Sequence, residues 1–256
     1  MFLERPVTFS EARDWLRRRV SVPTNLGSLE IAAAVPAEVR NQAFFSARVA
    51  SASILQKLRE NVAEIAAGEL GYAEARTRMK EILALEGYEI AAPGEADDRD
   101  VKKIQSSARL DLIFRQNVAM AHSRGQREVS EHPAVVELFP NYRYIANTDR
   151  HEAFDGIVLP KSDPFWQTHY PPIDFNCECF VIDEPGEPNA RTGQWTEDGQ
   201  SGVVEHRGQL LPVLPNESGY EFRSAPGEAP EMDLGRIEDV GWREQVRAEL
   251  EARGAL

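Results

Sequence analysis

Apolar residues recur at helical spacing through the first half of the chain, from Pro6 to about Val129. Such spacing predicts amphipathic helices, because residues three and four apart lie on one helical face. The periodic segments cover residues 8–20, 36–68, 71–90 and 101–129. The second segment is long enough for one or two helices, and short helical hairpins are expected to follow from this order.

Start and stop signals support these boundaries. Thr8 precedes Glu11 at the spacing of a capping box, so we expect Thr8 to be an N-cap residue. Pro36 stands at a first-turn position, and Gly68 and Gly87 stand where the second and third segments are expected to stop.

The same spacing predicts which side chains are buried. The expected core positions are Ala12, Trp15, Leu16, Ala73, Met79, Ile82, Leu83, Ile104, Leu112, Ile113, Val118 and Met120. Residues 91–100 are polar, with a proline and a glycine, and are expected to form an exposed linker. The fourth segment is the longest and is expected to be the spine of the helical part.

The pattern changes after Ser130, where prolines, tyrosines and short β-favouring runs appear. Strands are expected in residues 142–146, 177–182, 202–208 and 209–214, and a short charged helix in residues 235–256. We therefore predict an α+β fold, with a mainly helical N-terminal region followed by a small mixed α/β module of short strands and long loops. The predicted parts are a helical, partner-docking region (1–130), a motif module (131–184), and an acidic C-terminal extension with a hairpin and a terminal helix (185–256).

The charge and hydrophobicity of the chain limit which kinds of partner it is expected to bind. The 256 residues carry a formal net charge of −13, and no lysine follows Lys161. This charge opposes general coating of nucleic acid, so any DNA contact is expected to be local. No apolar run is long enough to span a membrane, and the N-terminus lacks the apolar core of a secretory signal, so we expect synthesis in the cytoplasm and no membrane partner.

Candidate chemistry is concentrated in residues 150–180, which hold both cysteines. If residues 150–154 are helical, His151 and Asp155 share a face, because they are four apart. If residues 176–182 form a strand, Cys177 and Cys179 also share a face. These four residues are the candidate metal ligands, because thiolates and an imidazole suit zinc. A disulfide between such close cysteines would be strained, so a reduced pair is expected.

Other interpretations of these residues remain open. The two cysteines could be small buried thiols that pack beneath a loop. His151 and Asp155 could form a base with its orienting carboxylate, as in hydrolases, or a local hydrogen bond that fixes a turn. A cysteine nucleophile beside His151 or His169 is a further alternative.

The remainder of this stretch predicts a stiff loop lined by aromatic residues. Prolines restrict the backbone, and the large rings supply apolar area that either joins the core or forms an interface. The candidate structural or interface residues are Gly156, Pro160, Asp163, Pro164, Phe165, Trp166, Pro171 and Pro172.

The order of these residues, from His151 to Cys179, resembles the signature of the phage Mu F-like head morphogenesis family. Residues 9–24 and 114–126 are also similar to helices of that family, so the resemblance covers about residues 6–184. The chain departs from the family pattern at Glu178, where the family usually places an arginine between the cysteines.

The resemblance implies a minor head protein of a tailed phage or prophage. Its implied partners are the portal protein and the major capsid or scaffold protein, and its implied location is the virion head near the portal vertex. It implies no enzymatic activity, and structural zinc at the four candidate ligands is the one cofactor that the residues suggest. The alternative is a metal-dependent hydrolase or nuclease that uses His151, Asp155, Cys177 and Cys179.

Overall fold

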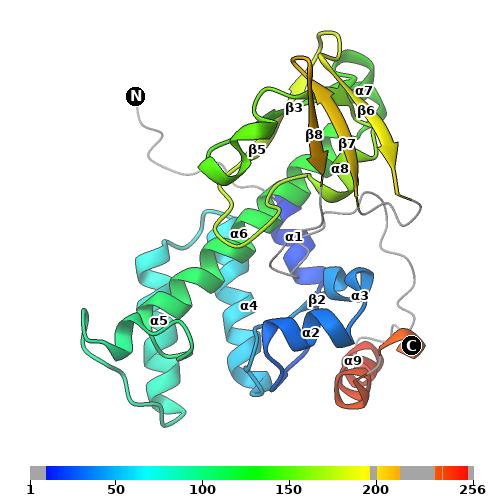
Figure 1. Ribbon diagram of the computed structural model, residues 1–256. Coiled ribbons are helices and arrows are strands. Elements are labelled where there is room, and N and C mark those ends of the chain that lie inside the picture. Colours follow the sequence, from blue (N-terminus) through cyan, green and yellow to red (C-terminus); the bar gives the residue numbers. More distant parts are fainter. Residues whose placement is uncertain (1–9, 197–200, 214–233, 238, 253–256) are drawn as a thin grey trace. The chain divides into compact units, whose positions relative to one another are not determined.

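A computed structural model describes residues 10–196, 201–213, 234–237 and 239–252 (Figure 1). Its contacts divide these residues into two compact units: residues 10–122 with 234–252, and residues 123–213. The first unit is mainly helical and the second contains the larger sheets, so the chain has the predicted α+β fold. The domain boundaries predicted at residues 130 and 184 remain a prediction.

The helical unit is built from amphipathic helices and one short parallel strand pair. Its elements are α1 (Ser10–Arg18), β1 (Val20–Ser21), α2 (Ser28–Ala34), α3 (Ala37–Gln42), β2 (Ala43–Phe44), α4 (Ala52–Ala66), α5 (Tyr72–Leu85), η1 (Asp97–Arg99), the first two-thirds of α6 (Ser107–Ser130), η3 (Leu234–Arg236) and α9 (Val240–Ala252). The segment 36–68 thus forms two helices with a two-residue strand after the first.

Local signals in the sequence explain the limits of α4 and α5. The Ser51 hydroxyl accepts a hydrogen bond from the Ile54 N–H at the start of α4. Gly68 and Gly87 follow the two helices with φ of +73° and +89°, which is the left-handed conformation that glycine adopts readily. The expected N-cap Thr8 lies outside the described residues.

Burial on α5 differs from the prediction at Ala73 and Ile82. Met79 and Leu83 are fully buried, but Ala73 is exposed and Ala75 takes its place in the core. Ala73 lies in the first turn of α5. Among the other predicted positions, Ala12, Leu16, Ile113 and Val118 are buried, whereas Trp15, Ile82, Ile104, Leu112 and Met120 are partly exposed.

Two apolar clusters hold the helical unit together. Helices α1, α4, α5 and α6 surround the larger one, and α4 and α5 run alongside each other as a hairpin in Figure 1. Polar bonds add to this packing, since Arg76 of α5 pairs with Asp111 of α6 at 2.8 Å. The smaller cluster joins α2 and α3 to Trp242 and Val246 of α9, so the predicted terminal helix contributes to this core.

The second unit contains two three-stranded antiparallel sheets. One has the order β4-β3-β5, with β4 (Val158–Pro160), β3 (Asn141–Ile145) and β5 (Phe180–Glu184). The other has the order β6-β7-β8, with β6 (Ala190–Trp195), β7 (Gly202–His206) and β8 (Gln209–Val213). The end of α6, α7 (Pro133–Leu138), η2 (Asp149–Phe154) and α8 (Phe165–Thr168) complete this unit.

Strand prediction succeeded in part. The expected strands near residues 142–146, 202–208 and 209–214 form as β3, β7 and β8. The expected strand over 177–182 begins only at Phe180, so both cysteines precede β5. Strands β4 and β6 were not predicted. Within the described residues, no helix is long and apolar enough to cross a membrane.

Candidate functional site

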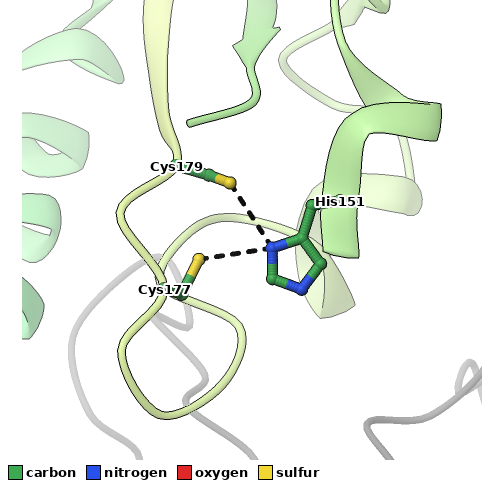
Figure 2. A group of neighbouring side chains, drawn as sticks. All are labelled: His151, Cys177 and Cys179. Carbon is green, nitrogen blue, oxygen red and sulfur yellow. Dashed lines mark hydrogen bonds between the residues drawn. The ribbon is translucent and has the colours of Figure 1, made fainter. Parts of the chain in front are cut away.

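Three predicted side chains converge at one buried place, as Figure 2 shows. His151 comes from the 3-10 helix η2, and Cys177 and Cys179 come from the loop that leads into β5. His151 Nδ1 lies 3.6 Å from Cys177 Sγ and 3.4 Å from Cys179 Sγ. The three residues are 6–7% exposed, and both cysteines are free thiols.

The short helix η2 sets the direction of the His151 ring. The His151 N–H donates to the Thr148 carbonyl at 3.0 Å, and the Thr148 hydroxyl lies 3.1 Å from Nδ1. The same hydroxyl lies 3.4 Å from Cys179 Sγ, and the Asn147 N–H donates to that sulfur at 3.4 Å. Residues 147–151 therefore contact both the imidazole and one sulfur.

The second nitrogen of the imidazole lies near a carboxylate. His151 Nε2 lies 3.6 Å from Asp174 Oδ2, beyond hydrogen-bond length but within ion-pair distance. Arg150 holds that carboxylate through bonds of 2.6 and 3.1 Å, and also donates to the Phe175 carbonyl. Sequence reasoning missed Asp174 and Thr148, although Asp174 lies within residues 150–180 and Thr148 lies two residues before them.

Asp155 lies outside the three-residue group. The prediction that it shares a helical face with His151 was wrong, because η2 is a 3-10 helix that ends at Phe154 and Asp155 has a non-helical backbone, with φ of −59° and ψ of 130°. Its Oδ1 accepts a hydrogen bond from the Ala146 N–H at 2.9 Å. The carboxylate thus fixes the turn between β3 and η2.

The two thiols differ in acidity. The hydrogen bond between them lowers the pKa of Cys179, and contacts from His151, Thr148 and the Asn147 N–H lower it further. The same thiol–thiol bond and burial raise the pKa of Cys177. These shifts favour the thiolate form at Cys179 and the neutral thiol at Cys177.

Tyr144 of β3 belongs to the same apolar cluster as the cysteines. Burial, and then the nearby sulfurs of Cys179 and Cys177, raise the pKa of Tyr144, so its phenol stays neutral. Its hydroxyl is buried and forms no well-aligned hydrogen bond among the described residues, although it interacts with the Cys179 sulfur. Burying a hydroxyl that lacks a good hydrogen bond costs free energy, so the residues around Tyr144 affect the stability of the site.

The predicted aromatic loop is part of the core. Phe165 and Trp166 are fully buried in α8, and their rings meet those of Tyr142, Tyr144 and Tyr170 at near-perpendicular angles. The Trp166 indole N–H donates to the Pro160 carbonyl at 3.0 Å. These rings pack beside the cysteines in one cluster, so they also form part of the surroundings of the site.

The remaining motif residues shape the backbone around this core. Asp163 Oδ1 accepts a hydrogen bond from the Phe165 N–H at 2.9 Å, which starts α8 after Pro164. Gly156 has φ of +75°, a conformation that suits glycine at the turn after η2. Pro171 and Pro172 are joined by a cis peptide bond, and the Pro171 carbonyl accepts a hydrogen bond from the Ser123 hydroxyl.

His169 completes the ring cluster without joining the metal-ligand group. It stacks on Phe165 with ring centroids 5.1 Å apart. Burial, and to a lesser extent the neighbouring His151, lower the pKa of His169 to about 4, so the ring is neutral near pH 7. His169 is thus a packing residue beside the site.

Two buried cations that the sequence did not predict hold the end of α6 to the motif. Arg127 donates to the Trp166 carbonyl at 3.1 Å and lies over the Tyr170 ring. Lys161 donates to the Ser130 carbonyl at 2.6 Å and pairs with Asp183 at 2.7 Å. Long basic side chains are usually exposed, so nothing in the local pattern indicated their burial.

A family described as "Phage Mu protein F like protein" matches residues 55–182 of the chain. The match runs from α4 into β5 and includes His151, Cys177 and Cys179.

Two curated relatives extend this similarity. The chain is 28% identical over 218 residues to the "Putative capsid assembly protein F" of Escherichia phage Mu, covering 80% of this chain and 48% of the relative. It is 29% identical over 215 residues to the "Mu-like prophage FluMu F protein" of Haemophilus influenzae, covering 80% of this chain and 49% of the relative. The chain spans about half the length of these curated relatives, and no solved structure matches it significantly.

Proposed function

Because the chain belongs to the Phage Mu protein F like family, we propose that it takes part in phage head assembly as a non-enzymatic minor head protein. The observation that carries this proposal is the span of the match, which includes the helices α4–α6 and the whole motif from η2 to β5. The name of the phage Mu relative, a capsid assembly protein, supports the same role.

The proposed partner is the portal protein of the same phage, with the major capsid or scaffold protein as the alternative. We assign docking to the helical unit, as predicted from the sequence. Its large exposed apolar side chains include Leu29 and Leu85, 69% and 89% exposed, although Leu138 and Leu210 of the second unit are also exposed. Exposed apolar residues are common on protein surfaces, but contacts with a partner are one way of covering them. Portal docking would place the protein in the virion head, near the portal vertex.

A role as general DNA coat is disfavoured by the net charge of −13. A net charge of this sign is compatible only with a local contact to DNA. A hydrolase or nuclease is also a weaker proposal, because the carboxylate predicted beside His151 and the one observed beside it both have structural partners. Asp155 accepts from a backbone N–H, and Asp174 is held by Arg150.

The test is to produce the full chain with each head protein encoded beside it and to purify the complexes through a tag on that partner. We expect copurification with the portal protein and the presence of the chain in purified virions. Copurification with the capsid or scaffold protein alone would overturn the portal assignment. Absence from virions together with failure to bind any of the three would overturn the assembly role itself.

A further inference from the structure

We propose that His151 Nδ1, Cys177 Sγ and Cys179 Sγ bind one zinc ion, which ties η2 to the start of β5. This site goes beyond the assembly role, since the role requires no metal. Asp155, which the sequence suggested as a ligand, is not part of the proposed set.

The donor atoms have the chemistry and spacing that zinc requires. Two thiolates and an imidazole are preferred zinc ligands, and the three atoms all lie within 4.8 Å of one another. In a tetrahedral site, the usual bond lengths would place a nitrogen and a sulfur roughly 3.5 Å apart. The observed Nδ1–Sγ distances of 3.4 and 3.6 Å agree with this spacing.

The His151 ring is oriented as in a metal-binding histidine. One ring nitrogen faces both sulfurs, and the other faces the Asp174 carboxylate at 3.6 Å. A carboxylate on the second nitrogen typically fixes the tautomer and makes the first nitrogen a better ligand. Arg150 in turn binds the Asp174 carboxylate and holds it beside the imidazole.

The alternative, a simple hydrogen-bonded cluster, explains the convergence less well. A neutral imidazole has one N–H, yet Nδ1 lies within 3.6 Å of both sulfurs and 3.1 Å of the Thr148 hydroxyl. A metal ion, by contrast, binds several donors at once. The Asn147 N–H at Cys179 Sγ is the kind of contact that stabilises a bound thiolate.

The fourth zinc ligand is a water molecule in this proposal. Three protein donors leave one tetrahedral position open. Tyr144, in the same cluster, has a buried hydroxyl that forms no well-aligned hydrogen bond among the described residues, and its interaction with the Cys179 sulfur places it beside the proposed ligands.

The location of the site explains what the ion does. Cys177 and Cys179 lie 26 and 28 residues after His151, and the loop that carries them has no regular element between Thr168 and Phe180. A bound ion would link these segments directly, because coordination stabilises the folded state wherever the unfolded chain lacks the site. A zinc ion bound by these three residues would therefore stabilise the folded loop.

The test is elemental analysis of the full chain, purified without a histidine tag from zinc-supplemented cells. We expect about one zinc per chain in the wild type and less than about a tenth of that in His151→Gln, Cys177→Ser and Cys179→Ser. Asp155→Asn is the matched control within the motif and should keep its zinc. Metal-free wild type, or equal zinc loss in Asp155→Asn, would overturn the proposed ligand set.

Cobalt substitution of the wild type avoids the risk that the variants fail to fold. Reconstitution of the metal-free chain with Co²⁺ should produce a sulfur-to-cobalt charge-transfer band and the intense visible bands of tetrahedral coordination. Binding without the charge-transfer band, or an intact disulfide between Cys177 and Cys179 in the purified protein, would overturn the site. Competition of this spectrum by one equivalent of Zn²⁺ would support it.

Discussion

His151 directs Nδ1 at the sulfur of Cys179, 3.4 Å away, although 28 residues separate them in the chain. This contact joins η2, at one end of β3, to the loop that enters β5. Because β3 and β5 are paired along their whole length from Asn141 to Ile145, the contact lies at the end of an already ordered strand pair. The sheet therefore positions His151, Cys177 and Cys179, and the contacts among these residues hold the loop before β5 against η2.

Asp174 provides the first prediction, because it touches His151 but neither sulfur. Asp174→Asn removes the negative charge beside Nε2 while keeping the shape of the side chain. We expect zinc affinity to fall by about 10-fold or more, the usual effect of removing such an outer partner. The measurement is competition with a chromophoric chelator, with Asp155→Asn as the control. Unchanged affinity would mean that the carboxylate serves only Arg150.

Trp166 provides a prediction about the aromatic core. Trp166→Ala removes a fully buried ring that contacts Tyr142, Phe165 and Tyr170, so unfolding free energy should fall by about 3–5 kcal/mol. Trp166→Phe keeps a ring but loses the indole bond to the Pro160 carbonyl, and should cost about 1–3 kcal/mol. Urea unfolding measures both. Equal stability of the two variants would show that the hydrogen bond, rather than the ring, dominates.

The helical part was predictable because its signals are local. Gly68 marks the end of α4, and Met79 and Leu83 follow the spacing of α5. Local rules also predicted β3, β7 and β8. Polar strand β6, with the sequence ARTGQW, has no such pattern and forms because β7 pairs with it.

The site was predictable in residue type but not in geometry. His151, Cys177 and Cys179 come together, but through a 3-10 helix and an irregular loop rather than the expected helix and strand. That difference replaced Asp155 with Asp174 as the carboxylate nearest the imidazole. Tertiary packing determines which side chains become neighbours in such a site, and these contacts cannot be predicted from residue spacing alone.

Asp98 provides a pH-dependent prediction in the helical unit. Burial raises the pKa of its carboxyl, but hydrogen bonds from Lys80 and the Ser107 N–H outweigh burial and hold the pKa at about 2. A pKa below that of the unfolded chain stabilises the fold above about pH 4, and this contribution is lost as the pH falls toward 2.

Asp98→Asn should therefore be less stable than the wild type at pH 7, by about 2 kcal/mol at most, with the difference shrinking between pH 4 and pH 2. Urea unfolding at these three pH values measures the effect. Asp97→Asn is a suitable control, because Asp97 forms an exposed pair with Lys103. A stability difference for Asp98→Asn that is constant with pH would contradict the cause given for its pKa.

Leu85 provides the prediction that connects the fold to the proposed function. It is 89% exposed at the end of α5, so Leu85→Lys should leave the free energy of unfolding nearly unchanged. A lysine at a helix C-terminus is also favourable to the helix. If the helical unit docks on the portal protein through this surface, the substitution should weaken copurification by about 10-fold or more, because it buries a charge in an apolar contact.

Thr77→Lys is the matched control for this substitution, since Thr77 is also exposed on α5 and the change adds the same charge. Equal loss of binding in both variants would indicate that net charge, not the apolar contact, controls association. Unchanged binding in both, with the portal complex still forming, would move the docking surface away from α5. Loss in Leu85→Lys alone would place the portal contact on this helix and make Leu29 the next position to change.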